Sequence, residues 1–139
     1  MAPFEVIGVG IDLVEIARFR ALLARRPALA LRCFSEAERA SLARRRDPVP
    51  ALAARFAAKE ATMKALGVGL GAFALAEVEV LSAPTGAPCL QLSGRAARLA
   101  AQRGATAFPL SLTHSEQSAS ALVLAQGAAA EQGSERGDR

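Results

Sequence analysis

The chain has 139 residues, 52% of them apolar, which is enough for one domain with a real hydrophobic core. No uncharged run reaches the roughly 18 residues of a membrane span. The apolar N-terminus carries Glu5 and Asp12 where a signal peptide has a basic lead, so we expect a cytoplasmic protein. Cys33 and Cys89 have no CxxC partner, which favours reduced thiols packed in a core over a disulfide framework.

The net charge of +4 is unevenly distributed along the chain. Residues 1–66 hold twelve basic and seven acidic side chains, whereas the remaining residues hold five and six. Such a bias suggests nucleic acid, but a chain with six Phe and neither Trp nor Tyr offers little aromatic surface for bases to stack on. An acidic protein or a phosphorylated small molecule fits the basic half as well.

The first predicted element is a strand over residues 5–16, EVIGVGIDLVEI, whose side chains alternate between two faces. One face carries four branched apolar side chains: Ile7, Val9, Ile11 and Leu13. The other face places Gly8 and Gly10 beside Asp12, so two glycines clear the approach to one carboxylate. Asp12 is then either the cap of a neighbouring turn or a ligand.

Three helices are predicted next. A basic helix ends near Pro27, and a second covers residues 35–46, with Ser35 as its cap and Glu38 as the capping-box partner. A long helix covers about residues 51–66 and ends at the glycines of GVGLG. These glycines follow a helix, whereas phosphate-binding glycine loops lie between a strand and the next helix, which favours helix termination.

The remaining chain predicts strands, one helix and a tail. The elements are strands at 76–81 and 88–92, a helix between Ser93 and Gly104, and strands at 108–115 and 119–125. The last residues have nothing to bury and predict a disordered tail over 127–139.

The long helix is apolar around most of its circumference. Leu52, Phe56, Met63 and Leu66 form one stripe, and six alanines cover most of the rest. This pattern predicts a buried helix. Its charged side chains, which include both lysines of the chain, then need partners because an unpaired buried charge is costly.

Two interpretations of Glu60 and Lys64 remain open from their spacing. Four residues apart on one helix, they form either an ordinary stabilising ion pair or parts of a functional site. In the functional interpretation, Glu60 binds a divalent metal together with Asp12, and Lys64 sits on a phosphate.

Two further features have alternative interpretations. His114 is the only histidine, which excludes His-pair zinc sites, and it is either structural or functional. The run Arg44–Arg46 is either a solvated face or a phosphate clamp. No nucleophile-elbow motif supports a Ser-His-Asp triad.

Five stretches, in this order and at these distances, resemble the holo-acyl-carrier-protein synthases, the short 4′-phosphopantetheinyl transferases. They are GVGIDLVEIARF, RCFSEAER, ARFAAKEATMKALGVGLG, AEVEVL and LSLTHS. The similarity covers about residues 5–126, and GxGxD followed by FxxKExxxKA in so short a chain is a specific combination. The larger two-lobed members of the superfamily do not fit this length.

The resemblance implies an α+β fold, with a single 4′-phosphopantetheinyl transferase domain over residues 1–126 and a tail over 127–139. An antiparallel sheet is implied to pack on the long buried helix. The family forms trimers whose sites lie between subunits, so we expect a homotrimer. In it, Asp12 of one chain is expected to face Glu60, Lys64 and Arg55 of its neighbour.

The resemblance also implies the residues of the site. Asp12 and Glu60 match the Mg²⁺ ligands, and Lys64 matches the lysine at the pyrophosphate; these three are the candidate catalytic residues. The coenzyme A contacts implied besides Lys64 are Arg46, Arg55, Gly67, His114 and Ser115. The basic helix is implied to face an acidic acyl carrier protein through Arg18, Arg20, Arg25 and Arg26.

Three positions depart from the family's pattern. Pro109 stands where the family usually has a histidine, and Ser118 where it has an aromatic residue. The aromatic residue before the strand at 76–81 is matched only by Phe73. Pro109 lacks a backbone donor, which weakens the case for pairing at the start of its strand.

The implied reaction moves 4′-phosphopantetheine from coenzyme A to a serine of an apo acyl carrier protein and releases adenosine 3′,5′-bisphosphate. Glu60 is the candidate general base. No membrane or nucleic acid partner is expected, and the sequence leaves open whether the carrier serves fatty acid, polyketide or peptide synthesis. The alternative from another class is a non-catalytic basic module that binds nucleotide or nucleic acid.

Overall fold

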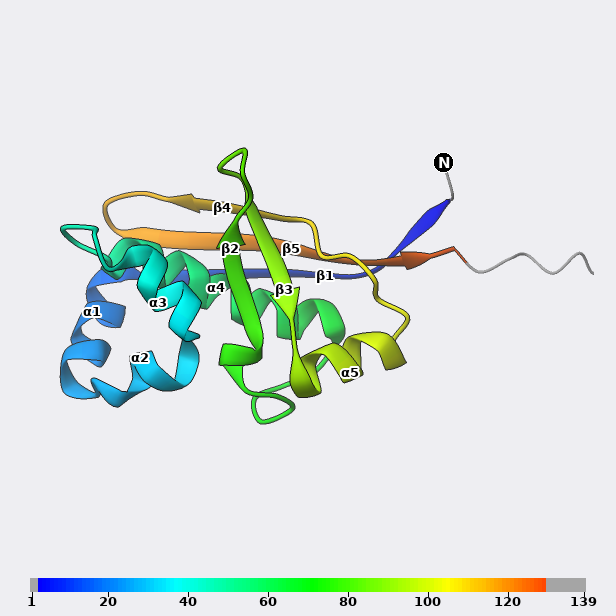
Figure 1. The fold of residues 1–139 in the computed structure, drawn as a ribbon, viewed down its shortest axis with the longest axis horizontal. Helices are drawn as coiled ribbons and strands as arrows, with labels where there is room; N and C mark the ends of the chain where they lie inside the picture. The colour runs from blue at the N-terminus through cyan, green and yellow to red at the C-terminus, as the bar shows by residue number, and fades with distance from the viewer. Residues whose placement is uncertain (1–2, 130–139) are drawn as a thin grey trace, which may run out of the picture.

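The computed structural model describes residues 3–129, and its two antiparallel sheets and five α-helices form an α+β fold (Figure 1). The elements in chain order are β1 (Phe4–Glu15), α1 (Ile16–Arg25), α2 (Ala28–Cys33), α3 (Glu36–Leu42), α4 (Val49–Leu66), the 3-10 turn η1 (Leu75–Glu77), β2 (Val78–Ser82), β3 (Pro88–Leu92), α5 (Gly94–Gln102), β4 (Leu110–His114) and β5 (Ser118–Ala128). One sheet has the order β1-β5-β4, and β2 and β3 form a separate hairpin. The predicted α+β class and antiparallel sheet are confirmed.

Strand β1 lies directly against helix α4, and two glycines make this contact possible. A Cβ added at Gly8 would overlap the carbonyl oxygen of Ala65, and one added at Gly10 would overlap that of Ala61. The sequence assigns these glycines to the space around Asp12, and that interpretation is wrong. They make room for the helix backbone because only a residue without a side chain allows so close an approach.

Helix α4 runs through the interior. Twelve of its 18 residues are buried, and mostly alanine faces the sheet, so strand and helix lie close together. Pro50 stands in the first turn, where its missing N–H costs no hydrogen bond. The helix ends at Gly67, whose φ of 69° is left-handed.

Two clusters of side chains form the core on either side of α4. The larger cluster joins α4 to the hairpin, α5 and β5 through residues such as Met63, Val80 and Val123. The smaller cluster joins the other end of α4 to α1 and α2, with Phe19 and Phe34 as its largest members. The core therefore holds α4 from several directions.

The helices before α4 differ from the prediction in their bounds. Pro27 ends the first helix and opens a second short one, α2, which the sequence did not predict. Helix α3 has the predicted capping box of Ser35 and Glu38 but ends at Leu42. It stops short of the predicted residue 46 because three consecutive arginines, followed by Asp47 and Pro48, do not favour further turns.

The cap of α5 and the strand pairing at Pro109 differ from what the sequence predicts. Ser93 is the N-cap of α5 but makes no side-chain cap bond. Instead, the Ala96 N–H donates to the Glu77 carboxylate at 3.3 Å. Pro109 precedes β4, and its carbonyl oxygen accepts from the Leu124 N–H at 2.9 Å, so strand pairing is maintained without the missing donor.

The C-terminal boundary and the cysteines also need correction. Strand β5 continues to Ala128, so the first residues assigned to the tail are paired with β1, and residues 130–139 lie outside the described part of the chain. Both cysteines are free, as expected. Cys33 is buried, but Cys89 is exposed and is not a core residue. None of the described helices is long and apolar enough to cross a bilayer.

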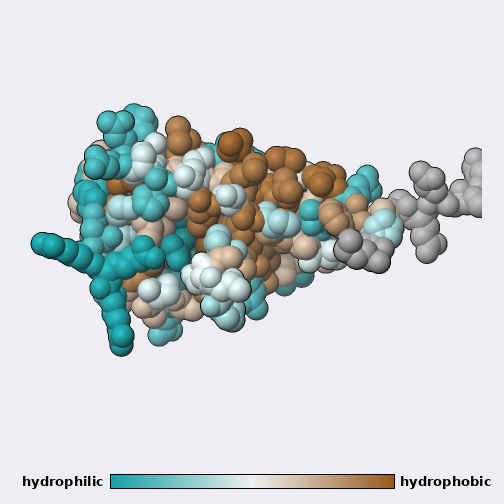
Figure 2. Space-filling model, turned by 90° about the horizontal axis from the view of Figure 1, so that it is seen from above, coloured by the Kyte–Doolittle hydropathy of each residue, from teal (hydrophilic) through white to brown (hydrophobic). Residues whose placement is uncertain are grey.

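Within residues 3–129, nothing covers one face of the three-stranded sheet. Helix α4 packs on the other face, while four side chains of β1 remain 41–65% exposed: Ile7, Val9, Ile11 and Leu13. Ile11 pairs in register with Leu122 of β5, which is also exposed. Hydrophobic side chains gather along the face seen in Figure 2. We call these four exposed side chains of β1, together with Leu122, the outer apolar face.

We predict that Gly10→Ala destabilises the protein. The new Cβ would push β1 away from α4, and overpacking of this kind costs about 1–3 kcal/mol of unfolding free energy. Urea denaturation measures the change. Gly69→Ala is the matched control because nothing lies within 4 Å of its added Cβ. Equal stability of the two variants would contradict the tight contact between strand and helix.

Candidate functional site

Asp12 and Lys64 meet where β1 crosses α4. The Lys64 Nζ donates to Asp12 Oδ1 at 3.2 Å and to the Ile11 carbonyl oxygen at 2.9 Å. The Asp12 side chain is 13% exposed and that of Lys64 is 56% exposed, so the lysine reaches a recessed carboxylate from the solvent side. Of the two interpretations of Lys64, the ordinary pair with Glu60 is therefore not the one that forms.

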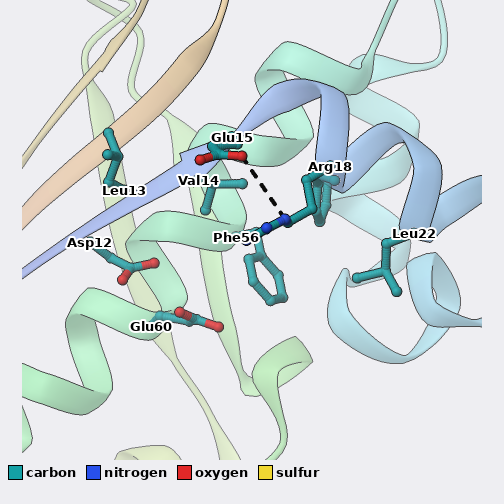
Figure 3. A pocket seen from close by; sticks show the side chains of 9 residues that line it. Asp12, Leu13, Val14, Glu15, Arg18, Leu22, Phe56 and Glu60 are labelled. Atoms are coloured by element: carbon teal, nitrogen blue, oxygen red, sulfur yellow. Dashed lines mark ion pairs between the residues drawn. The ribbon is translucent and has the colours of Figure 1, made fainter.

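Glu60 lies in the same pocket as Asp12, on the neighbouring element (Figure 3). Burial, and then the neighbouring Asp12 carboxylate, raise the pKa of Glu60 to about 7, although the Lys64 ammonium acts in the opposite direction. Two carboxylates this close disfavour each other's ionised form, and a cation between them would relieve that cost.

These two carboxylates fit a hard divalent cation. Mg²⁺ in enzymes is commonly held by one or two carboxylates together with substrate phosphates, so a third protein ligand is not required. Within residues 3–129, no group of three or more His, Cys, Asp or Glu side chains is placed to hold a metal ion. Asp12 and Glu60 therefore match the donor set of a cation that is shared with a substrate.

The wall of this pocket is apolar. Leu22 of α1 and Phe56 of α4 line it beside the carboxylates, with Arg18 at its rim (Figure 3). Phe19 of α1 lines it as well. This wall was not predicted from the sequence, although the apolar spacing of Phe19 and Leu22 within a basic helix was a usable signal. The pocket thus offers an ionic end and a hydrophobic side to one ligand.

The structure brings Asp12 and Glu60 together within one chain, whereas the resemblance implied that they come from two subunits. Asp12 pairs with Lys64 of its own chain and lines one pocket with Glu60. The physical reason is the glycine contact, since Gly10 brings β1 onto α4 just before Asp12. All three candidate catalytic side chains therefore belong to one chain.

Arg55 lies in a different pocket. It is 8% exposed, its Nη1 donates to the Ala51 carbonyl oxygen at 3.3 Å, and its buried Nε has no partner among the described residues. Burial, and then the nearby Arg45, lower the pKa of Arg55. Both arginines line this pocket together with Ser111. A buried guanidinium with an unused donor beside a second arginine is suited to bind an anion.

Within the run Arg44–Arg46, the resemblance singled out Arg46 and not its neighbour Arg45. Arg45 shares a pocket with Arg55, and Arg46 is not among the residues that line that pocket. The run of three arginines gave no signal to distinguish its members, because the turn after α3 follows no helical period.

His114 and Ser115 lie in a third pocket, which is lined by Arg20 and Asp47 as well. Ser115 Oγ accepts from the Gln117 and Ser118 N–H groups, each at 3.2 Å, and so closes the turn between β4 and β5. Ser115 thus has a structural role whether or not it also contacts a ligand.

The predicted carrier-facing arginines are not equivalent. Arg20 makes two bonds to the Asp47 carboxylate, at 2.7 and 3.1 Å, so its charge is locally balanced. Arg18, Arg25 and Arg26 are exposed. Arg18 and Arg25 are seven residues apart on the chain and share one face of α1, and Arg18 reaches the rim of the carboxylate pocket.

Gly67 lies at the end of α4, one turn beyond Lys64. The Arg103 Nη1 donates to the Leu66 carbonyl oxygen at 2.6 Å, beside this glycine. A side chain at position 67 would therefore be strained by its positive φ and would approach Arg103 at 3.3 Å. The residues that the resemblance assigned to coenzyme A thus do not share one pocket within a single chain.

The chain is similar to proteins of one family. The model of the 4′-phosphopantetheinyl transferase superfamily matches residues 8–122. The holo-[acyl-carrier-protein] synthase of Desulforudis audaxviator is 43% identical over 123 residues, which cover 88% of this chain and 94% of that protein. The protein of the same name from Streptomyces coelicolor is 46% identical over 123 residues, covering 88% and 99%.

A solved structure shares the fold. The holo-[acyl-carrier-protein] synthase of Helicobacter pylori, in complex with coenzyme A, matches with a TM-score of 0.74 and 28% identity. The match covers 84% of this chain and 98% of that one.

We predict that Glu60 makes the metal-free protein less stable as the pH rises from about 4.5 to about 7. The pKa of its folded-state carboxyl is raised to about 7, so the folded chain holds the proton that the unfolded chain has released. Urea denaturation at pH 5 and pH 8 measures this. Glu60→Gln should lose less stability over this interval than the unsubstituted protein, and equal losses would show that Glu60 has an ordinary pKa.

Proposed function

Because the chain belongs to the holo-[acyl-carrier-protein] synthases of the 4′-phosphopantetheinyl transferase superfamily, we propose that it moves 4′-phosphopantetheine from coenzyme A to a serine of an apo acyl carrier protein. The second product is adenosine 3′,5′-bisphosphate, and the reaction takes place in the cytoplasm. Family membership makes the protein an enzyme, so the alternative of a non-catalytic basic module is set aside.

The convergence of Asp12, Glu60 and Lys64 in one chain carries this proposal. Transfer of a phosphoryl-type group asks a protein mainly for position and for neutralisation of charge. Asp12 and Glu60 would hold Mg²⁺, which makes a bound phosphorus more electrophilic. Lys64, already paired with Asp12, would neutralise charge on the pyrophosphate, and Glu60 would accept the proton of the attacking serine.

The rim of the same pocket supplies the surface for the carrier. Arg18 and Arg25 present positive charge on one face of α1, next to the apolar wall formed by Phe19 and Leu22. An acidic carrier protein complements this charge, and steering of this kind acts chiefly on encounter. Arg26 would add to the same field, while Arg20 is held by Asp47.

We also propose a homotrimer, supported by the outer apolar face. Soluble monomers rarely leave a long row of large apolar side chains exposed, and this row follows most of one strand. Copies of the chain would cover it. The cover is needed on the sheet, rather than on α4, whose apolar side chains are already buried within the chain.

Such an assembly would complete the coenzyme A site from two chains. Arg55 and His114 do not line the carboxylate pocket of their own subunit, yet the resemblance assigns them to the same ligand. The proposed division therefore has Asp12, Glu60 and Lys64 from one chain, and Arg55, with its buried free donor, and His114 from the neighbour. Arg45 joins the neighbour's contribution.

The reaction is tested by incubating the protein with coenzyme A, Mg²⁺ and an apo carrier protein, with intact mass as the readout. We predict that Asp12→Ala and Glu60→Ala each lower transfer by about 100-fold or more, because each removes a ligand of the charge-neutralising cation. Both variants should remain folded. Normal transfer by either variant at low Mg²⁺ would rule out the two-carboxylate site.

We predict that mixed oligomers distinguish the two possible divisions of the site. Asp12→Ala and Arg55→Ala chains, denatured and refolded together, should regain activity because some interfaces combine an intact Asp12 with an intact Arg55. Asp12→Ala and Glu60→Ala chains should not complement, because both residues come from the same chain. The reverse pattern, in oligomers shown to have exchanged subunits, would contradict the proposed division.

We predict that Arg18→Glu with Arg25→Glu raises KM for the carrier protein by about tenfold while changing KM for coenzyme A little, because steering charges act on encounter. The effect should shrink as salt is added. Arg95→Glu, an exposed change on α5, is the control and should leave both KM values unchanged. Equal effects on both substrates would place the carrier elsewhere.

A further inference from the structure

Lys59, the other lysine of the chain, is buried completely and has no part in the proposed chemistry. Its side chain is 0% exposed, and its ammonium donates to Glu38 Oε1 at 2.7 Å, to the Leu75 carbonyl oxygen at 3.0 Å and to the Val78 carbonyl oxygen. An ammonium has three donors, so all of them are used. The Nζ also lies 5.3 Å from the centre of the Phe34 ring.

Glu38 extends this network to two further elements. Its Oε1 also accepts from the Ser35 N–H at 3.1 Å, which closes the capping box of α3. Its Oε2 accepts from the Val80 N–H of β2 at 3.2 Å. The pair of Glu38 and Lys59 therefore ties α4 to α3, η1 and β2 at one point.

This tie holds α4 on the side opposite β1. At 100° per residue, Lys59 and Ala61 are about 160° apart around the helix, and Ala61 is the residue that meets Gly10. Glu60 lies between them, about 100° from each. The direction of Glu60 is thus set by a backbone contact on one side and by a buried ion pair on the other.

A small rotation of α4 would matter at Glu60. Side chains lie about 5–6 Å from a helix axis, so a turn of about 20° moves a carboxylate by about 2 Å. Mg²⁺ requires near-ideal octahedral geometry, with oxygens about 2.0–2.1 Å away. On the β1 side, the alanine contacts set the distance between strand and helix more than the rotation of the helix, because a methyl group makes few directional contacts, and Lys64 adds hydrogen bonds from its exposed side chain.

Stability alone does not account for the pair. Removing two charges from water is costly, and replacing a buried ion pair with apolar groups is often neutral or favourable. Hydrogen bonds to three separate elements instead fix geometry, since each has a narrow range of length and angle.

We propose that Glu38 and Lys59 form a positioning pair that fixes the rotation of α4, so that Glu60 faces Asp12 at the distance a shared divalent cation requires. This inference rests on the proposed function, because it concerns the cation site of Asp12 and Glu60. Neither residue of the pair contacts the substrate or the cation in this role.

The test uses the double variant Glu38→Gln with Lys59→Met, which removes both charges, keeps similar side-chain volumes and leaves a Gln oxygen for the capping box. Urea denaturation measures its stability, and electron paramagnetic resonance measures its binding of Mn²⁺, used as the probe. We expect a folded protein that binds Mn²⁺ about tenfold more weakly, as when groups that orient a metal ligand are lost.

Thr62→Val is the matched control. Thr62 is also fully buried on α4, but its Oγ1 donates only to the Ala58 carbonyl oxygen of the same helix, at 2.7 Å. This variant loses a buried hydrogen bond without losing a tie to another element, so its Mn²⁺ affinity should equal that of the unsubstituted protein.

The possible results distinguish a failure of the positioning role from a failure of the cation site. A folded double variant with unchanged Mn²⁺ affinity overturns the positioning role, and so does an equal loss in Thr62→Val. If the double variant does not fold, Glu38→Gln alone decides, and unchanged affinity in it overturns the role. If Mn²⁺ binding by the unsubstituted protein is unaffected by Asp12→Ala, the cation site fails first and the inference with it.

Discussion

The close contact between β1 and α4 is the constraint on which the rest of the structure depends. Gly8 and Gly10 let a strand backbone rest on the carbonyl groups of a helix, and the alanines at 61 and 65 meet them from the other side. Any larger residue would separate the two elements and with them the two carboxylates. Asp12 and Glu60 share a pocket because the glycines remove the side chains that would normally stand between a strand and a helix.

A few charged side chains satisfy several of the polar backbone groups in this small core, although the buried Arg55 Nε has no partner among the described residues. Lys59 and Glu38 supply donors and acceptors to backbone groups of α3, η1 and β2, and Glu77 does the same at the start of α5. Each carboxylate accepts hydrogen bonds from backbone N–H groups. A domain of this size gains order from such contacts, because it has little apolar area with which to hold each element separately.

The sequence predicted the fold where local signals agreed with the final structure. The alternating pattern of β1, the glycine at the end of α4 and the capping box of Ser35 each depend on neighbours in the chain, and all three were predicted correctly. The cap of α5 was not, because its acceptor, Glu77, lies 19 residues from Ala96. The role of Gly10 was assigned wrongly for the same reason, since its partner on α4 is distant in sequence.

Three residues that the sequence singled out lie close together in the structure, but the way they pair was not predictable. Motif spacing identified Asp12, Glu60 and Lys64 as candidates. Spacing does not show which charges pair, and Lys64 pairs with Asp12 instead of Glu60. Arg45 was overlooked in favour of Arg46 because a turn has no period from which a direction can be derived. The exposure of the apolar face of β1 was also not predictable from the sequence. An alternating strand has the same pattern whether its apolar face packs in the core of its own chain or against a partner.

Strand β1 carries Asp12 on one face and the outer apolar face on the other, and this alternation has a consequence for how the chain tolerates changes of length. A single residue inserted or deleted between Gly10 and Asp12 would exchange the two faces, turning the carboxylate outward and an apolar side chain inward. The strand already contains one irregularity of register, between Val6 and Gly8. The N-terminal end of β1 can therefore accept a change of length, whereas the segment from Gly8 to Asp12 cannot. In that segment the number of residues is more strictly constrained than their types.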